Sequence, residues 1–247
     1  MKTGKFILAL AAIATLFFTS CSDDDGYSLD KFWISVVTIE NPSSDSYFFF
    51  DTDDGERMWT IATNLPYYRP KDGQRVVADY TILSDRPEGS GYDHDAKLNN
   101  VLYEILTKDI VDITSENTET LGNDPIQIED IWIGGDHLNV EFVYGGLNKL
   151  HYINLGRDIS GSYNDGKIHL EFRHNANGDS PSYRMWGMAS FRLKPLQQNA
   201  SGSVTLVIHT KEYNQPEEKT YELVYQFDRP SSDVRKITFG ENIGDIK

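Results

Sequence analysis

A run of acidic residues near position 50 has the side chains needed to hold a cation. Residues 51–56 of this 247-residue chain read DTDDGE, and carboxylate oxygens are the ligands that calcium prefers. A calcium loop of the helix–loop–helix kind needs glycine at its sixth position and glutamate at its twelfth. Here glycine is fifth and the twelfth residue is Ala62. Because the same residues also provide an Asp-Gly hairpin turn, we predict a turn here rather than a metal site.

A second group with possible chemistry is His169, Glu171 and Arg173, which share one face of a strand by their period of two. His and Glu at that spacing provide half of a metal site or of an acid–base pair. The same side chains also form ion-pair ladders with a neighbouring strand. Since no His-Glu-x-x-His pair accompanies them, we favour the ladder and predict no metal and no other cofactor.

Motifs of nucleophilic catalysis are absent. The chain has no Gly-x-Ser-x-Gly, no Ser-x-x-Lys and no Gly-rich phosphate loop. Its many carboxylates leave a hydrolase with a carboxylate pair open as an alternative, because such a pair is defined by its separation in space. Our prediction is a protein that is not an enzyme.

Cys21, the only cysteine, follows an apolar leader. Lys2 and Lys5 precede apolar residues 6–18, and the small residues Thr19 and Ser20 come just before the cysteine. The apolar run is shorter than the roughly 20 residues that span a bilayer. This order indicates a secretory signal over residues 1–20, cleaved to leave a lipid on Cys21. An acylated Cys21 leaves no thiol for disulfides, metal binding or nucleophilic attack.

The four residues after the cysteine are Ser22, Asp23, Asp24 and Asp25. They resemble the export signal of surface lipoproteins in Bacteroidota, although a short acidic run also serves as a solvated spacer. We predict a tether over residues 21–30 and a lipid-anchored protein of the outer membrane that faces the cell exterior.

The net charge restricts the partners. It is −15 for the whole chain and −17 without residues 1–20, which carry two lysines and no acidic residue. Nucleic-acid binding needs lysine or arginine to displace counterions. We therefore expect no nucleic-acid partner, and contact with the membrane only through the lipid anchor.

The elements that position these residues read as strands almost throughout. Residues 31–40, 47–50, 58–62 and 73–83 are rich in β-branched and aromatic side chains, and a strand, or a helical turn followed by a strand, is expected at 101–113. A polar stretch at 114–125 predicts a domain boundary. Seven further runs follow at regular spacing, near 126–133, 138–144, 150–155, 167–172, 185–193, 204–209 and 220–227. The pattern predicts an all-β chain with a small barrel at 31–115, an antiparallel β-sandwich at 122–230 and a C-terminal tail at 231–247.

An ordered set of short segments resembles the NigD-like lipoproteins of Bacteroidota. The segments are YTIL (80–83), LTKDI (106–110), GNDPI (122–126), DIWI (130–133), LN (138–139), HYINL (151–155) and LEFRHN (170–175). The resemblance covers residues 30–228 and implies an N-terminal OB-like barrel followed by a C-terminal β-sandwich. It implies no established activity, and only an association with bacteriocin immunity, which is not a mechanism.

Together these features predict a non-enzymatic binding protein that engages a protein partner, with bacteriocin immunity as one version. The alternative is a glycan-binding accessory lipoprotein that stacks sugars on exposed aromatic rings. The tryptophans at 33, 59, 132 and 186 lie in strand-like runs, and we expect them mainly to pack in the core.

Overall fold

The structure is a computed structural model that describes residues 26–41, 48–199, 202–213, 215, 217–227 and 246. The predicted leader, Cys21, residues 22–25 and all of the predicted tail except Ile246 lie outside the described residues. No helix among the described residues is long and apolar enough to cross a membrane.

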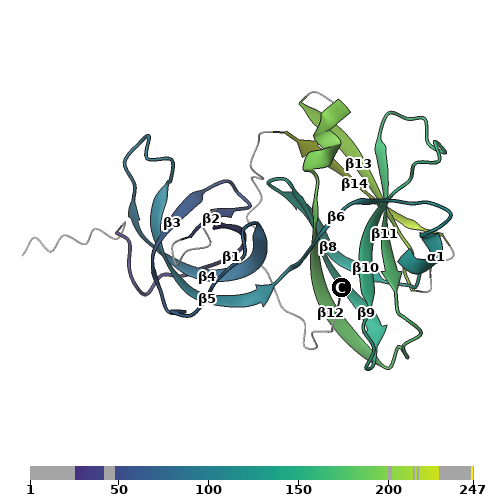
Figure 1. The fold of residues 1–247 in the computed structure, drawn as a ribbon, viewed down its shortest axis with the longest axis horizontal. Helices are drawn as coiled ribbons and strands as arrows, with labels where there is room; N and C mark the ends of the chain where they lie inside the picture. Colours follow the sequence, from purple (N-terminus) through teal and green to yellow (C-terminus); the bar gives the residue numbers. More distant parts are fainter. Residues whose placement is uncertain are drawn as a thin grey trace, which may run out of the picture.

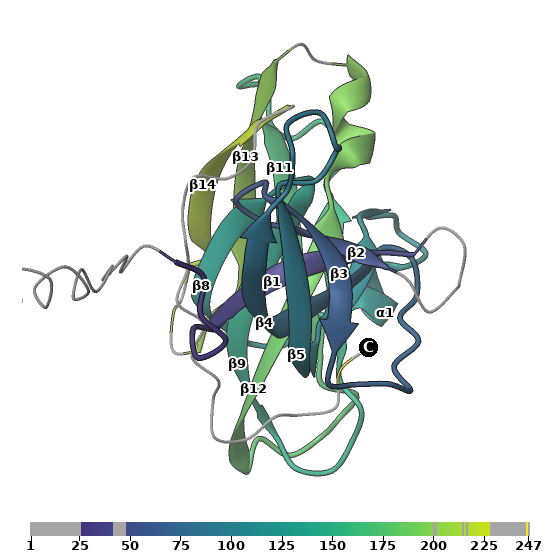
Figure 2. The same ribbon diagram turned by 90° about the vertical axis from the view of Figure 1, so that its left-hand side faces the viewer.

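The first domain is a closed five-stranded barrel (Figure 1). Its strands are β1 (Trp33–Glu40), β2 (Phe49–Thr52), β3 (Arg57–Thr63), β4 (Gln74–Asp85) and β5 (His94–Glu104). They close in the order β1-β2-β3-β5-β4, and β3 and β5 pair in parallel. Alternate side chains such as Val37, Phe50 and Met58 fill the interior and are fully buried. Figure 2 views the molecule along the long axis, with the barrel in front.

The predicted hairpin turn at 51–56 is confirmed. Strands β2 and β3 pair as far as Asp51 and Arg57, and the turn closes with hydrogen bonds from the Gly55 amide to the Thr52 carbonyl and from the Thr52 amide to the Glu56 carbonyl. Gly55 has a φ of 93°, a left-handed conformation that glycine adopts without steric cost.

The domain boundary lies earlier in the chain than the polar composition of 114–125 predicted. Strands β6 (Leu106–Asp109) and β7 (Val111–Asp112) pair with sandwich strands, not with the barrel. The chain therefore leaves the barrel at Ile105, and the boundary expected at 114–125 is wrong. Polar residues at 114–125 form a connection inside the sandwich domain, with the short helix α1 (Thr118–Leu121). Composition could not separate a linker from such a loop, because both are exposed.

The second domain is a sandwich of two sheets. All seven predicted runs are strands: β8 (Gln127–Gly134), β9 (His137–Gly146), β10 (Tyr152–Arg157), β11 (Ile168–Asn175), β12 (Tyr183–Arg192), β13 (Ser203–Thr210) and β14 (Lys219–Gln226). One sheet has the order β14-β13-β11-β10-β7 and the other β6-β12-β9-β8. The barrel and the sandwich are confirmed. Most sandwich pairs are antiparallel as expected, but β6 with β12, β7 with β10 and β11 with β13 are parallel.

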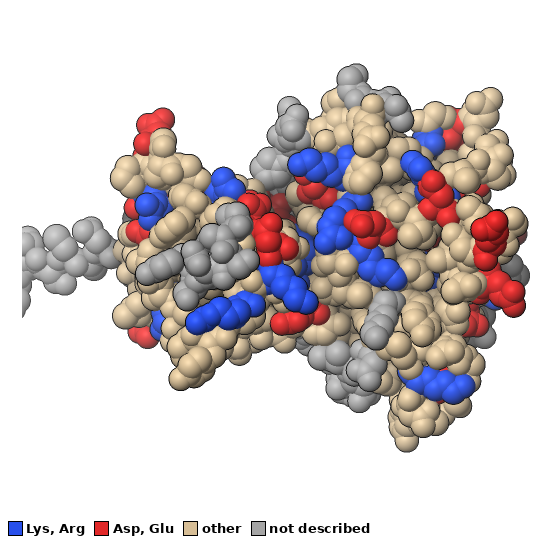
Figure 3. Space-filling view, in the orientation of Figure 1, with Lys and Arg blue, Asp and Glu red and all other residues tan. Residues whose placement is uncertain are grey.

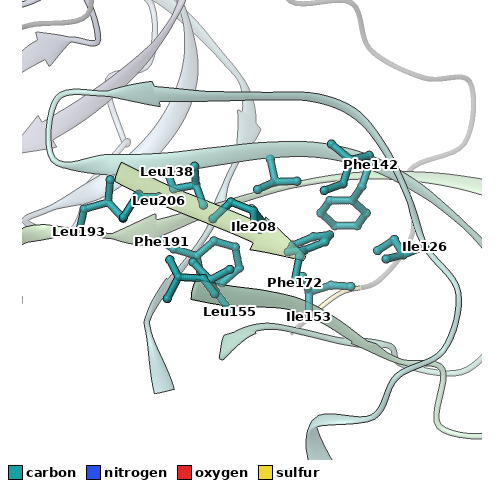
Figure 4. Packing of buried hydrophobic residues seen from close by; sticks show 14 of the residues in the cluster. Ile126, Leu138, Phe142, Ile153, Leu155, Phe172, Phe191, Leu193, Leu206 and Ile208 are labelled. Carbon is teal, nitrogen blue, oxygen red and sulfur yellow. The ribbon is translucent and has the colours of Figure 1, made fainter. Parts of the chain in front are cut away.

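The core of the sandwich lies between these sheets (Figure 4). Phe142 and Phe172 meet from opposite sheets with ring centroids 5.4 Å apart, and Phe191 contacts Phe172 edge-on. Alternation along the strands directs these residues inward, and their removal from water supplies the main stabilisation.

A separate apolar cluster joins the two domains. Val77 of β4 and Ile105 pack with Trp132, Trp186 and Met188 of the sandwich, all nearly inaccessible to solvent. Two of the four tryptophans, Trp132 and Trp186, therefore pack at the domain junction, which agrees with the core packing expected for them. A buried hydrophobic junction of this kind opposes relative motion of the domains.

Candidate functional site

A cleft of about 530 Å³ opens where the barrel meets the sandwich. Barrel strand β1, the β2–β3 hairpin and the start of β4 form one wall, and the β8–β9 turn forms the other. The lining residues are Thr38, Glu40, Asp51, Thr52, Asp53, Gly55, Arg57, Arg75, Gly134, Gly135, Asp136 and His137. Figure 3 shows acidic and basic side chains side by side at this junction, without a patch of a single sign.

The floor of the cleft is held by Arg75, a guanidinium whose side chain is only 1% exposed. Two of its nitrogens donate to the two carboxylate oxygens of Asp53, at 2.5 and 2.9 Å. It also donates to Thr38 Oγ1 at 3.0 Å and, across the domain boundary, to Asn139 Oδ1 at 2.7 Å. Such bidentate, charge-assisted bonds are directional and strong.

The remaining polar atoms around Asp53 come from the sandwich. Asn139 donates its amide to Asp53 Oδ2 at 3.1 Å, and the Trp132 indole N–H lies 3.4 Å from the same oxygen. Ser190 donates to Asn139 Oδ1. These hydrogen bonds tie the barrel to the sandwich. We call the residues that make them the interdomain network: Asp53, Arg75, Trp132, Asn139 and Ser190. A buried network with its partners present makes the cleft rigid.

The accessible wall of the cleft carries a different ionic group. Arg57 donates from Nε to Asp51 Oδ1 at 3.1 Å, and its Nη2 lies 3.5 Å from Glu40 Oε2. Burial raises the pKa of Glu40, and the charge of Asp51 adds to the effect. Burial also raises the pKa of Asp51, against the lowering effect of Arg57. One guanidinium is thus shared between two carboxylates that are each crowded by negative charge.

Next to Arg57 the outer face of the barrel carries an aromatic group. Phe49 of β2 and Trp59 of β3 lie opposite each other with nearly parallel rings, and Tyr92 of the β4–β5 loop contacts both edge-on. OB barrels bind oligosaccharides on this face. Here Arg57 lies 4.7 Å over the Phe49 ring and Arg86 5.7 Å over the Trp59 ring, so guanidinium groups already cover ring faces.

The remaining predicted chemistry falls elsewhere. Glu171 and Arg173 pair with each other along β11 at 2.5 Å, whereas the predicted ladder ran to a neighbouring strand. His169 contacts His209 and Asp165. Among the described residues, no group of three or more His, Cys, Asp and Glu side chains is placed to hold a metal ion. The predicted lipid-attachment and export residues, Cys21 to Asp25, lie outside the described part.

Sequence reasoning missed the interdomain network. Its one signal was a charged Arg75 directly before the apolar run from Val76. A lone buried charge in a strand needs a partner, but the partners Asp53 and Asn139 lie far away in sequence. The third residue of the acidic run at 51–56 is the counter-ion of Arg75.

Both halves of the chain match family models. The model of the NigD-like N-terminal OB domain matches residues 36–105, and that of the NigD-like C-terminal beta sandwich domain matches residues 109–225. Among curated proteins none matches.

Solved structures agree with these matches. A protein of unknown function from Bacteroides vulgatus is 26% identical, with a TM-score of 0.70 over 84% of this chain and 96% of that one. A protein from Parabacteroides distasonis, described as toxin related, is 33% identical, with a TM-score of 0.68 over 80% and 95%. A NigD-like immunity protein from Bacteroides caccae is 18% identical, with a TM-score of 0.57 over 82% and 99%, and shows the fold alone. Since the two models span both domains and this architecture recurs at 33% identity, the chain belongs to the NigD-like family.

Proposed function

We propose that this protein is a non-enzymatic, lipid-anchored envelope protein that binds a segment of a protein partner in the interdomain cleft. The observation that carries the proposal is the cleft itself, whose floor is held rigid by the interdomain network. A preformed site spares a ligand the cost of ordering the protein. The accessible Glu40, Asp51 and Arg57 provide charges of both signs, which suits polar segments of a protein.

The anchor is part of the proposal and rests on the sequence around Cys21. An acyl chain there places the protein on the outer membrane, and residues 22–25 direct it to the cell exterior. The immunity and toxin-related descriptions of two solved relatives support a protein partner of the envelope. In this form of the proposal the chain intercepts a protein toxin at the cell surface.

A test of the cleft is capture from envelope extracts by the mature protein, compared with Glu40→Lys. The Glu40 side chain is 39% exposed, so reversing its charge leaves the fold intact. We expect loss of the captured protein with Glu40→Lys and its retention with Glu116→Lys, a matched reversal at an exposed residue away from the cleft. Equal capture by all three proteins would exclude the cleft as the binding site.

A test of the anchor is Cys21→Ser. Intact-mass analysis and membrane fractionation should show loss of the acyl chains and release of the mutant. Equal membrane retention and equal mass shift in wild type and mutant would contradict lipidation at Cys21.

Glycan binding is the second candidate, because Phe49, Trp59 and Tyr92 occupy the ligand face of an OB barrel. The arginines over these rings argue against it, since a sugar needs a free ring face. Trp59→Ala distinguishes the two functions: it abolishes retention on a glycan array if sugars bind here, and leaves capture of a protein in the cleft unchanged.

The hydrolase alternative is weaker. A glycosidase separates the roles of its two carboxylates by shifting their pKa values apart. In the cleft, burial raises the pKa of both Glu40 and Asp51, so the two carboxyl groups are shifted in the same direction and are not set apart as acid and base. We expect no turnover across a panel of glycan, ester and peptide substrates, and any turnover abolished by Glu40→Gln or Asp51→Asn would overturn this.

A further inference from the structure

Two histidines face each other at the end of the sandwich remote from the cleft. His151 lies just before β10 and His174 lies on β11, and each is 1% exposed. His151 Nδ1 and His174 Nε2 are 2.7 Å apart. The cleft lies at the His137 end of β9 and this pair beside Tyr144 near its other end, which puts them roughly 23 Å apart along the strand.

The outer nitrogens of the pair also have partners, and both are acceptors. His174 Nδ1 lies 3.1 Å from the Pro125 carbonyl oxygen, and His151 Nε2 lies 3.2 Å from Asp179 Oδ2. The Asp179 side chain is 2% exposed. It accepts backbone N–H bonds from Leu147 at 2.6 Å, from Asn148 at 3.1 Å and from Lys149 at 3.3 Å. Burial acts to raise the pKa of Asp179, but these N–H donors and His151 hold it well below its usual range. Asp179 is therefore ionised.

Counting protons fixes the charge of the pair. Three hydrogen bonds run through the two rings, and neither the Pro125 carbonyl nor the Asp179 carboxylate brings a proton. The rings must then carry three protons on four nitrogens, which is one positive charge beside Asp179. Two neutral rings supply only two protons, and two charged rings place N–H against N–H across 2.7 Å.

The surroundings decide which ring is neutral. Burial, together with the charge of His151, lowers the pKa of His174 to about 4, although the nearby Asp124 acts to raise it. The Tyr144 ring packs on both imidazoles, with centroids 4.6 and 5.3 Å away. The Lys149 ammonium of the β9–β10 loop donates to the carbonyls of Asn177 and Gly178. His174 is thus neutral, and His151 carries the charge.

We propose that His151, His174 and Asp179 form a proton-operated latch, which holds the β9–β10 and β11–β12 loops together with three protons and releases them when a fourth binds. Asp179 belongs to the β11–β12 loop and its amide donors to the β9–β10 loop. The latch bridges them to Pro125, which lies just before β8. This regulation goes beyond binding in the cleft and does not depend on it.

The direction of the pH dependence follows from the pKa of His174 in the open and closed states of the latch. In the open state its pKa is near 6.5, and in the closed state it is about 4. Between about pH 6.5 and 4 the open pair binds up to four protons and the closed pair three, so the closed state weakens as pH falls through that interval. The opening equilibrium should rise by up to about tenfold per pH unit in that interval.

The test is hydrogen exchange of the Leu147, Asn148 and Lys149 amides in the mature protein, expressed as protection factors from pH 6.5 to 4.5. We expect protection to fall as pH falls, to a value up to about 100-fold lower at pH 4.5 than at pH 6.5. In His174→Gln the side-chain amide accepts from His151 and donates to Pro125 without titrating, so protection should stay constant between pH 6.5 and 4.5.

A matched control is His209→Gln, which alters the other histidine pair, His169 and His209, joined at 2.9 Å; the three amides should keep the wild-type pH profile. Asp179→Asn should lower their protection at every pH. The titration of the His174 ring protons by NMR gives an independent reading. Protection that does not change with pH, a wild-type profile in His174→Gln, or a His174 pKa near 6.5 would each overturn the latch.

Discussion

Arg75 and Arg57 both form ion pairs with carboxylates of the β2–β3 hairpin in the same cleft, yet they differ in access to water. The Arg75 side chain is 1% exposed and that of Asp53 14%, whereas Arg57 and Asp51 are 39% and 36% exposed. The first pair is held by Thr38 of the barrel and by Trp132 and Asn139 of the sandwich. The second faces the open cleft.

This difference in exposure indicates that the two ion pairs of one hairpin have different roles, one structural and one in binding. Solvent screens an exposed pair, which contributes about 0–1 kcal/mol. In a buried pair the loss of one partner leaves an uncompensated charge and costs about 3–5 kcal/mol. We therefore assign Arg75 and Asp53 to holding the domains, and Arg57, Asp51 and Glu40 to the ligand.

The largest expected effect comes from Asp53→Ala. It leaves the Arg75 guanidinium buried without its counter-ion, so the free energy of unfolding should fall by about 3–5 kcal/mol in urea denaturation. The matched change at the exposed pair, Asp51→Ala, should cost less than about 1 kcal/mol. Similar losses in the two variants would break the comparison.

Gly134→Ala tests the packing against Asp53. A Cβ at Gly134 would lie 2.0 Å from Asp53 Oδ2, so the carboxylate must move away from Arg75. We expect a loss of roughly 2–3 kcal/mol in the same assay. In a double-mutant cycle with Asp53→Ala, Gly134→Ala should cause little further loss of unfolding free energy, because the carboxylate that the new Cβ would contact is gone. Additive losses would show that the cost arises elsewhere.

His137 adds a pH dependence to the buried side of the cleft. Burial, with Arg75 and Arg192 nearby, lowers the pKa of His137 to about 3. Because the folded value lies below the unfolded value of about 6.5, this stabilisation is complete above about pH 6.5 and declines as pH falls toward 3. Between pH 6.5 and 5 the loss is up to about 2 kcal/mol. His137→Gln should remove this part of the pH dependence, measured as the difference from wild type in urea denaturation at each pH. Curves that fall in parallel would contradict the assignment.

The smallest effect on stability is expected from Arg57→Gln. It removes an exposed partner of Asp51 and Glu40, and the unfolding free energy should change by less than about 1 kcal/mol. Capture of the envelope partner should nevertheless be lost. An unchanged capture, with Glu40→Lys also unchanged, would move the ligand away from the exposed half of the cleft.

Strand positions and the order of the domains were predictable because they depend on local patterns. Alternation in runs such as 204–209 placed the sandwich strands, and the Asp-Gly sequence at 54–55 placed the β2–β3 turn. The joint between domains was not predictable, because residues 106–112 read as one strand-like stretch with the end of the barrel. Only their pairing with β10 and β12 assigns them to the sandwich.

The sequence by itself determined the all-β barrel and sandwich, the net acidity and the family, since period-two alternation, charge and ordered motifs are written along the chain. Tertiary structure alone decided which charges are buried and which histidines meet. Asp53 and Asn139 are 86 residues apart and share a hydrogen bond, and His151 and His174 are 23 residues apart. Distant strands must pack and exclude water before burial can shift the pKa of His174. The same packing gives Arg75, and not Arg57, the contacts that connect the two domains.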